Sequence, residues 1–210
     1  MLALDLFEDF VNNSGYISKP IAGGTALLLS NPLSQGYYVG VVNLQAVAGG
    51  DEISINLLYD TTNSPIDGQA TIDLGGGPFQ FECRASLGTI PTAIDDANIE
   101  IGARNNAALG FGLGPGNFGN QNWWAIGVAG PDIDTGILAT AAITKFRIQH
   151  DPVTDTATWY INDVLVATKI AAGLNGVSYR CSCHVENISN TSGQLFLLVD
   201  YIHVKYSTVR

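Results

Sequence analysis

Paired carboxylates are the residues whose spacing comes nearest to a catalytic arrangement in this sequence. Retaining glycosidases need two carboxyl groups about 5–5.5 Å apart. Alternate positions of a β-strand supply such a pair, because they share one face of the sheet. In the segment IDDANIEIG, Asp96 and Glu100 share a face only if strand pairing begins at Asp96, and the amide Asn98 then stands between them. Glycan cleavage is therefore the least favoured hypothesis, and we predict that the chain is not an enzyme.

Two turns rich in aspartate are candidates for a calcium site. The segment DPVTDTA offers Asp151 and Asp155, and PDIDTG offers Asp132 and Asp134. Calcium takes six to eight oxygen ligands, and neither segment supplies them alone. Aspartates in such turns commonly accept hydrogen bonds from their own backbone. We predict that the protein has no cofactor, and calcium at these turns is the alternative.

The three cysteines do not form a metal motif or a disulfide framework. In the segment CSCH, Cys181 and Cys183 are two apart, so in a strand they point the same way. No second cluster of cysteine and histidine completes a tetrahedral site with them, and the number of cysteines is odd. We predict that Cys83, Cys181 and Cys183 are buried thiols.

The candidate ligand or interface residues lie in and just after the Gly-rich segment 109–122. This is the longest irregular stretch of the chain, and such loops frequently contact partners. Trp123 and Trp124 are adjacent, so in a strand one faces the core and the other is available as a sugar platform or interface anchor. Core or subunit contact is favoured over sugar. The candidates are Phe118, Asn120, Trp123 and Trp124.

Charge limits the classes of partner. The chain has 9 Lys+Arg against 19 Asp+Glu, a formal net charge of -10, which argues against nucleic acid and anionic membranes. Only 13% of residues are charged, about half of the typical ~25%. Two explanations stay open: other subunits cover part of the surface, or the surface is rich in neutral polar residues.

The elements that must position these residues are almost all strands. Most segments alternate with period two or form short apolar runs, bounded by Gly, Pro, Asn or Asp. Strands are predicted at 26–30, 37–47, 52–60, 70–74, 79–88, 98–105, 122–130, 144–151, 156–161, 164–170, 179–187 and 194–207. Short helices are predicted at 4–11 and 135–142. This pattern predicts an all-β, antiparallel sandwich or barrel.

Alternation assigns faces to two of these strands. In 79–88 the apolar face holds Phe79, Phe81, Cys83, Ala85 and Leu87. In 194–207, strict alternation places Phe196, Leu198, Ile202, Val204 and Tyr206 with Asp200 on one face, and Leu195, Leu197, Val199, Tyr201, His203 and Lys205 on the other. Both faces are apolar over 195–199, which predicts a strand inside a sheet. Asp200 is expected to be paired or hydrogen-bonded.

The segment TATWYINDVLVAT predicts a β-hairpin. Asn162 and Asp163 form its tight turn, because both residue types tolerate the positive φ that such turns require. Trp159 and Ile161 are expected on one face and Tyr160 on the other. The hairpin is expected to be a structural element with no binding role of its own.

The second half of the chain resembles the concanavalin A-like lectin/glucanase jelly roll, in its laminin-G-like and bacteriophage structural branches. The resemblance lies in FQFECRASLGTI, ANIEIGARN, TKFRIQHDPVTDTATWYINDVLVATKI and FLLVDYIHVKY, together with the N-terminal LFEDFV, and covers about residues 75–210. It implies an antiparallel jelly-roll sandwich. The glucanase branch carries a Glu, Asp, Glu motif on one strand, which IDDANIEIG lacks.

The resemblance and the absence of a catalytic motif lead to one main expectation. We expect a non-enzymatic structural protein of a bacteriophage virion, such as a capsid decoration or cement protein or a head or tail fibre component. Its partners would be virion or capsid proteins and copies of itself, for example in a trimer. A carbohydrate-binding, lectin-like module for host-surface adhesion is the alternative, with glycans as the partner.

Domain organisation and location follow from the length and the first residues. With 210 residues we expect a single domain, in which residues 1–25 form an N-terminal arm for docking or edge pairing. MLALDLFEDFVNN has no basic segment before its apolar residues, so no signal peptide is predicted. No apolar run approaches ~18 residues. We expect synthesis in the host cytoplasm and a final location in the virion.

Overall fold

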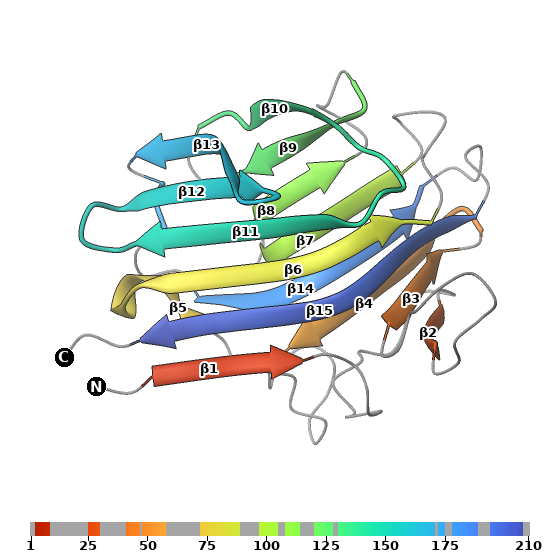
Figure 1. The fold of residues 1–210 in the computed structure, drawn as a ribbon, viewed down its shortest axis with the longest axis horizontal. Helices are drawn as coiled ribbons and strands as arrows, with labels where there is room; N and C mark the ends of the chain where they lie inside the picture. Colours follow the sequence, from red (N-terminus) through yellow and green to blue (C-terminus); the bar gives the residue numbers. More distant parts are fainter. Residues whose placement is uncertain are drawn as a thin grey trace.

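Two antiparallel β-sheets packed face to face make up the computed structural model (Figure 1). The structure describes residues 3–8, 25–29, 41–46, 48–57, 72–88, 97–104, 108–113, 120–127, 130–170, 172–174, 178–188 and 194–207. The predicted all-β antiparallel sandwich is confirmed. The single-domain prediction stays a prediction, and most of the expected arm at 1–25 lies outside the described residues.

Sheet A is the layer at the front of Figure 1. Its order is β13-β12-β11-β6-β15-β3-β2, and β1 also pairs with β15. The strands are β1 (Ala3–Glu8), β2 (Thr25–Leu29), β3 (Val41–Ala46), β6 (Phe79–Leu87), β11 (Thr144–Asp151), β12 (Thr156–Ile161), β13 (Val164–Ile170) and β15 (Leu195–Ser207). The long strand β15 therefore lies inside the sheet, with β6 on one side and β3 and β1 in succession on the other.

Sheet B lies behind sheet A and has the order β10-β9-β8-β7-β14-β4. Its strands are β4 (Asp51–Leu57), β7 (Ala97–Arg104), β8 (Ala108–Leu113), β9 (Asn122–Ile126), β10 (Ile133–Leu138) and β14 (Ser178–Asn187). The short β5 (Ile72–Asp73) pairs with β14, and one 3-10 turn, η1 (Leu74–Gly76), follows it. Among the described residues, no helix is long and apolar enough to cross a membrane.

The core lies between the sheets and joins them through aromatic side chains. Phe146 of sheet A packs against Phe111 and Trp123 of sheet B, with ring centroids 5.1 and 4.7 Å apart. Trp159 is fully buried, and its Nε1 donates a hydrogen bond of 2.8 Å to the carbonyl of Gly110. This polar link lets the bulky indole cross the core without leaving its N–H unsatisfied.

Cys83, Cys181 and Cys183 are buried free thiols, as predicted. Burial raises the pKa of the Cys83 thiol well above its ordinary value, with the neighbouring thiol of Cys183 as a further cause. The sulfur atoms of Cys83 and Cys183 lie 3.6 Å apart, one on each sheet. Because both side chains are fully enclosed by apolar neighbours, these cysteines act as core residues.

The predicted hairpin is confirmed. Strands β12 and β13 pair antiparallel around Asn162 and Asp163, which have φ of 49° and 65°. Trp159 and Ile161 are buried and Tyr160 is half-buried on the opposite face, as expected. The backbone N–H of Lys145 donates to Asn162 Oδ1 (3.0 Å), so the turn is tied to β11.

The predicted faces of the last strand are wrong beyond Val199. Val199 is opposite Ala85, but Tyr201 is opposite Arg84, so Asp200 is an extra residue that forms a β-bulge. The bulge changes the parity of the strand. The residues that face the core are therefore Leu195, Leu197, Val199, Ile202 and Val204. Asp200 is turned outward, where its Oδ2 lies 3.4 Å from Arg84 NH1.

Both predicted helices are wrong where the structure describes them. Residues 3–8 form β1, because the open edge of β15 offers hydrogen bonds to a segment too short to be a stable helix on its own; residues 9–11 lie outside the described residues. In 135–142, residues 133–138 form β10, which pairs with β9. Thr135 and Gly136 are poor helix formers, and Gly136 has a φ of 70°.

The Gly-rich segment 109–122 is only partly irregular, since β8 covers Ala108–Leu113. Gly110 is opposite Gly102 of β7. A Cβ atom on Gly110 would lie 2.5 Å from the carbonyl oxygen of Ile101, and one on Gly102 would lie 2.4 Å from that of Leu109. The glycines therefore allow two strands to approach closely above Trp159.

Candidate functional site

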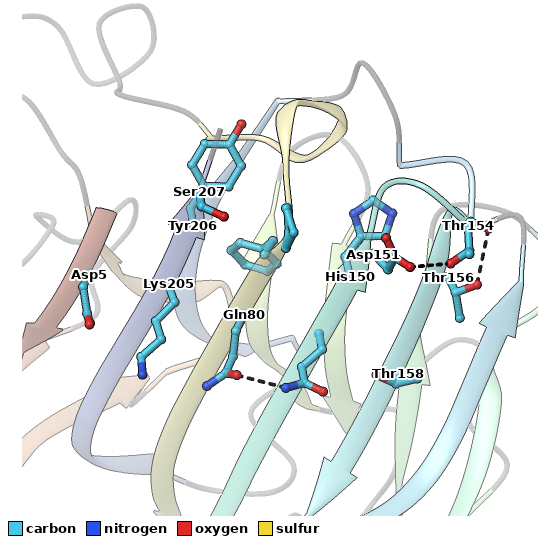
Figure 2. A pocket seen from close by; sticks show the side chains of 13 residues that line it. Asp5, Gln80, His150, Asp151, Thr154, Thr156, Thr158, Lys205, Tyr206 and Ser207 are labelled. Carbon is cyan, nitrogen blue, oxygen red and sulfur yellow. Dashed lines mark hydrogen bonds between the residues drawn. The ribbon is translucent and has the colours of Figure 1, made fainter. Parts of the chain in front are cut away.

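The outer face of sheet A carries a pocket of about 540 Å³ (Figure 2). Strands β1, β15, β6, β11 and β12 contribute its lining, together with the turn between β11 and β12. The outward-facing polar residues of the lining include Asp5, Gln80, Gln149, Asp151, Thr156, Thr158 and Lys205. The volume falls within the range of about 300–1,000 Å³ that is typical of small-molecule sites.

Five of these side chains form one row across five strands. The strand register places Thr158 opposite Gln149, Gln149 opposite Gln80, Gln80 opposite Lys205, and Lys205 opposite Asp5. Directly opposed residues in antiparallel strands are close enough for their side chains to interact. The row, which we call the pocket row, contains hydroxyl, amide, ammonium and carboxylate groups.

The two glutamines at the centre of the pocket row are joined to each other. Gln149 Nε2 donates a hydrogen bond of 2.9 Å to Gln80 Oε1. Among the described residues, no further hydrogen bond is made by the amide nitrogen of Gln80 or the amide oxygen of Gln149. A dashed line in Figure 2 marks the hydrogen bond that Gln80 accepts.

The wall of the pocket beside β12 is built by the turn between β11 and β12. Asp151 accepts hydrogen bonds from the backbone N–H of Val153 (2.9 Å) and the hydroxyl of Thr154 (2.9 Å). These bonds lower the pKa of Asp151, first through Val153 and then through Thr154. Asp151 is therefore ionised at neutral pH and holds the turn in shape.

A buried histidine fixes the other side of this turn. His150 is fully buried, and its Nε2 lies 3.1 Å from Asp155 Oδ1. Asp155 also accepts hydrogen bonds from the backbone N–H groups of Gly173 and Leu174. Burial opposes ionisation of Asp155, but these hydrogen bonds outweigh it and lower the pKa of the carboxyl group.

The opposite end of the pocket row is held by the N-terminal strand. Asp5 Oδ1 of β1 lies 2.6 Å from His203 Nε2 of β15. This hydrogen bond lowers the pKa of Asp5. The contact therefore joins β1 to β15 and fixes a carboxylate at the edge of the pocket.

Next to the pocket row lies a second polar cluster, which we call the charged network. Tyr201 donates to Glu82 Oε1 (2.7 Å), Lys145 Nζ lies 3.3 Å from both Glu82 Oε2 and Asp163 Oδ1, and Arg147 NH1 lies 3.0 Å from Asp163 Oδ1. The Arg147 guanidinium also stacks 4.3 Å above the ring of Tyr160. Burial, and then the bond to Glu82, raise the pKa of Tyr201, so its hydroxyl stays protonated and donates.

The sequence candidates lie elsewhere, at the β9–β10 end of sheet B. Trp123 is buried in the core and Trp124 is half-buried on the other face. Trp124 Nε1 donates to Asn120 Oδ1 (3.2 Å), and Asn120 Nδ2 donates to Asp134 Oδ2 (2.7 Å). The structure thus brings together Asn120 and Trp124, while Phe118 lies outside the described residues. Their role in ligand or subunit binding stays a prediction.

Internal hydrogen bonds occupy the aspartates of the turn in which calcium was the alternative. Asp134 accepts from Asn120, from Asn122 and from the N–H of Gly136, and these bonds lower its pKa, with Gly136 the largest cause. Asp132 accepts a bond of 3.3 Å from the N–H of Gly127. Within the described ranges, no three His, Cys, Asp or Glu side chains form a group that could hold a metal. The absence of a cofactor remains a prediction.

The candidate glycosidase acids are not part of the pocket. Glu100 lies on β7 of sheet B, and Asp96 lies outside the described residues. The pocket's own acids, Asp5 and Asp151, are separated by β15 and β6. Three strand spacings amount to about 14 Å, which exceeds the carboxylate separation of about 5–9.5 Å that glycoside hydrolysis requires.

The sequence reasoning did not identify the pocket row. Its side chains come from segments far apart in the chain, and only the pairing of β6 with β11, β15 and β1 brings them together. Alternation in FQFECRASL did place Gln80 on the outward face. The missing information was the register between strands.

Comparison with known proteins supports the fold. No protein-family model and no curated protein matches the sequence. An endo-β-1,4-glucuronan lyase from the fungus Trichoderma reesei is similar in structure, with a TM-score of 0.62 and 11% identity over 96% of this chain and 95% of that one. A protein of unknown function from Shewanella oneidensis MR-1 is similar with a TM-score of 0.60 and 13% identity, over 99% and 89% of the two chains.

A third similar structure is the binding domain of a toxin. The binding domain of botulinum neurotoxin DC, solved in complex with rat synaptotagmin II, has a TM-score of 0.52 and 11% identity, and covers 99% of this chain and 44% of that one. Identities this low show the fold alone. The fold of this chain is an antiparallel β-sandwich of the jelly-roll type.

Proposed function

We propose that this protein is a non-enzymatic carbohydrate-binding module that binds glycans in the pocket on the outer face of sheet A. The observation that carries the proposal is the pocket row, which presents amide, hydroxyl and charged groups at the surface of a cavity of about 540 Å³. Sugar hydroxyls both donate and accept hydrogen bonds, and these side chains offer both kinds of partner. The wide separation of Asp5 and Asp151 supports binding without hydrolysis.

The names of two similar structures support this proposal, because both involve carbohydrate. One is a lyase named for a glucuronan, and the other is a structure whose subject is entry of botulinum neurotoxin type C through two ganglioside molecules. The activity of either protein is not transferred to this chain, because the identity of each is close to 10%.

A glycan array tests the proposal. We expect the protein to bind at least one class of immobilised polysaccharide. A Thr158→Trp substitution should abolish that binding, because it fills the pocket from β12. Thr140→Trp is the matched control, since Thr140 is exposed in the segment before β11 and does not line the pocket. If the wild-type protein binds no glycan on the array, the proposal of carbohydrate binding is contradicted.

A second candidate function is the structural role in a bacteriophage virion. It is supported by apolar side chains exposed on β10 and β13, the edge strands of the two sheets. They are Ile137 and Leu138 on β10, and Val164, Leu165 and Ile170 on β13, with exposures from 40% to 76%. Exposed apolar groups along sheet edges are suited to contact with other subunits. Virion and capsid partners, a homo-oligomer and a location in the virion belong to this candidate.

Light scattering and mass spectrometry test the structural role. We expect a homo-oligomer in solution and recovery of the chain from purified virions of the phage that encodes it. Leu138→Lys with Ile170→Lys should weaken the assembly while leaving glycan binding intact. A monomeric protein without affinity for capsids would contradict this candidate and leave the carbohydrate-binding proposal in place.

A further inference from the structure

We infer that the ligand of the pocket is an extended chain of uncharged sugars that lies across the strands of sheet A, and that Gln80 and Gln149 determine its specificity. The inference rests on the proposed carbohydrate binding and adds the class and direction of the ligand. It depends on three properties of the pocket row: its length, the arrangement of its hydrogen-bonding groups, and its charge.

The length and direction follow from strand register. Thr158, Gln149, Gln80, Lys205 and Asp5 lie directly opposite one another on five neighbouring strands. With strands about 4.8 Å apart, the row extends about 19 Å perpendicular to the strands. A single monosaccharide can contact only part of it. A linear oligosaccharide lying along the row can contact one protein side chain after another.

The glutamine pair offers sugar hydroxyls a fixed donor and a fixed acceptor. The bond from Gln149 Nε2 to Gln80 Oε1 uses one donor and one acceptor site of the pair. The amino group of Gln80 remains a donor, and the amide oxygen of Gln149 remains an acceptor. Because each glutamine holds the other in place, little side-chain freedom is lost when a ligand binds.

This arrangement discriminates by the presence of hydroxyl groups. A site built to hydrogen-bond a hydroxyl rejects an analogue that lacks it, because the protein groups are then left unpaired. A ligand whose neighbouring hydroxyls have been removed or oxidised should therefore bind poorly. An intact chain satisfies both the donor of Gln80 and the acceptor of Gln149.

The charge around the pocket favours uncharged sugars. Asp5 stands at one end of the pocket row, Asp151 also lines the pocket, and Lys205, which supplies the ammonium group of the row, is opposite Asp5. The other basic side chains described on this face already contact acids: Arg84 contacts Asp200, Lys145 contacts Glu82 and Asp163, and Arg147 contacts Asp163. At Arg84, Lys145 and Arg147 a uronate carboxylate would have to compete with these acids, and at Lys205 it would lie beside the Asp5 carboxylate, in a chain with a net charge of -10.

Affinity electrophoresis with soluble polysaccharides provides the test. The neutral probes are mixed-linkage β-glucan, dextran and mannan, and the acidic probes are alginate and polygalacturonate. We expect the wild-type protein to be retarded by at least one neutral probe and by neither acidic probe. Gln80→Ala and Gln149→Ala should each weaken the retained interaction by about tenfold or more, as loss of a hydrogen bond in a binding site does.

Gln45→Ala is the matched control. Gln45 is a half-buried glutamine on β3 of the same sheet and does not line the pocket. This variant should bind like the wild-type protein. Circular dichroism of all three variants checks that they fold, so that a loss of binding can be assigned to the pocket.

Two changes in the probe test the ligand class directly. Cleavage of neighbouring hydroxyl pairs with periodate, followed by borohydride reduction, should abolish retardation by the neutral probe. Calorimetry with oligosaccharides of increasing length should show affinity rising until the chain covers the row of about 19 Å, and then levelling off.

The outcomes separate this inference from the proposed function. If the wild-type protein binds a neutral probe but Gln80→Ala and Gln149→Ala bind equally well, the glutamine pair is not the specificity element and the inference fails alone. Retardation by alginate or polygalacturonate only would also overturn the inference while leaving carbohydrate binding intact. If no probe is bound by the wild-type protein, the inference fails, and an empty glycan array would then contradict carbohydrate binding as well.

Discussion

The outer face of sheet A contains two neighbouring polar regions that differ in how completely they are paired. In the charged network, Lys145 contacts both Glu82 and Asp163. Tyr201 donates a hydrogen bond to Glu82, and Arg147 contacts Asp163. In the pocket row, Gln80 and Gln149 make one hydrogen bond to each other and keep further capacity. Gln80 and Glu82 are only two residues apart on β6.

The comparison shows how one strand face can serve two purposes. Charged groups that are partly buried must be paired, since an unpaired charge is costly. Uncharged amides and hydroxyls can remain unpaired at the surface, because water satisfies them until a ligand replaces it. Structural polar groups and binding groups can therefore alternate along β6, β11 and β15 without a change of fold.

The largest expected difference between the two regions concerns stability. Glu82→Ala should lower the free energy of unfolding by about 1–3 kcal/mol, because it removes the acceptor of the Tyr201 hydroxyl and one of the two carboxylates that Lys145 contacts. Gln80→Ala on the same strand should change it by less than about 0.5 kcal/mol. Urea denaturation followed by circular dichroism measures both. Equal losses in the two variants would show that the regions do not differ.

The next comparison concerns how the affinity for a neutral polysaccharide depends on salt. Affinity for the neutral polysaccharide should be unchanged up to about 0.5 M salt, because screening weakens only interactions between charges. Lys145→Met, in the charged network, should likewise leave affinity within about twofold. Calorimetry at low and high salt measures this. A steep fall with salt would assign binding to the charged network.

A smaller effect is expected at the hairpin tip. Asp163→Asn removes the carboxylate shared by Lys145 and Arg147 but keeps a residue type that tolerates the positive φ of the turn. Because the Asp163 side chain is 57% exposed, the loss of stability should stay below about 1 kcal/mol. Thermal unfolding should show this loss shrinking at high salt. A larger, salt-independent loss would indicate damage to the turn.

The smallest effect concerns acid sensitivity at the pocket end. The folded pKa of Asp155 is lowered, because the hydrogen bonds to its carboxylate outweigh the cost of its burial. Its contribution to stability is present above the unfolded pKa of about 3.9 and is lost as pH falls through the folded pKa. Asp155→Asn should therefore make the decline of the unfolding temperature shallower between about pH 5 and about pH 2. An unchanged slope would contradict this.

Local patterns predicted much of the fold. Alternation placed Phe79, Phe81 and Cys83 in the core, and the Asn162-Asp163 turn was predicted from the φ values that these residue types tolerate. Both are decided by neighbours in the sequence. The β8 strand was missed although Leu109, Phe111 and Leu113 alternate with glycine, because glycine is more common in loops than in strands.

Non-local features could not be predicted from one sequence. The bulge at Asp200 is visible only in the pairing of β15 with β6. It places Tyr201, His203 and Lys205 on the outward face of the strand, whereas strict alternation would place them on the core face. The pocket row depends on the same register, because Gln80 and Gln149 are separated by 69 positions in the chain. The candidate binding face is thus a property of the assembled sheet.

The position of the chain ends bears on how the protein can be attached to anything else. Strand β1 begins at Ala3, opposite Ser207 at the end of β15, so these two strand ends lie side by side (Figure 1). Asp5 and Ser207 also line the pocket. A purification tag, a surface linker or a fused domain attached next to Ala3 or Ser207 would start beside the pocket and obstruct it. Immobilisation through the β10 and β13 edges would leave the pocket open to solvent.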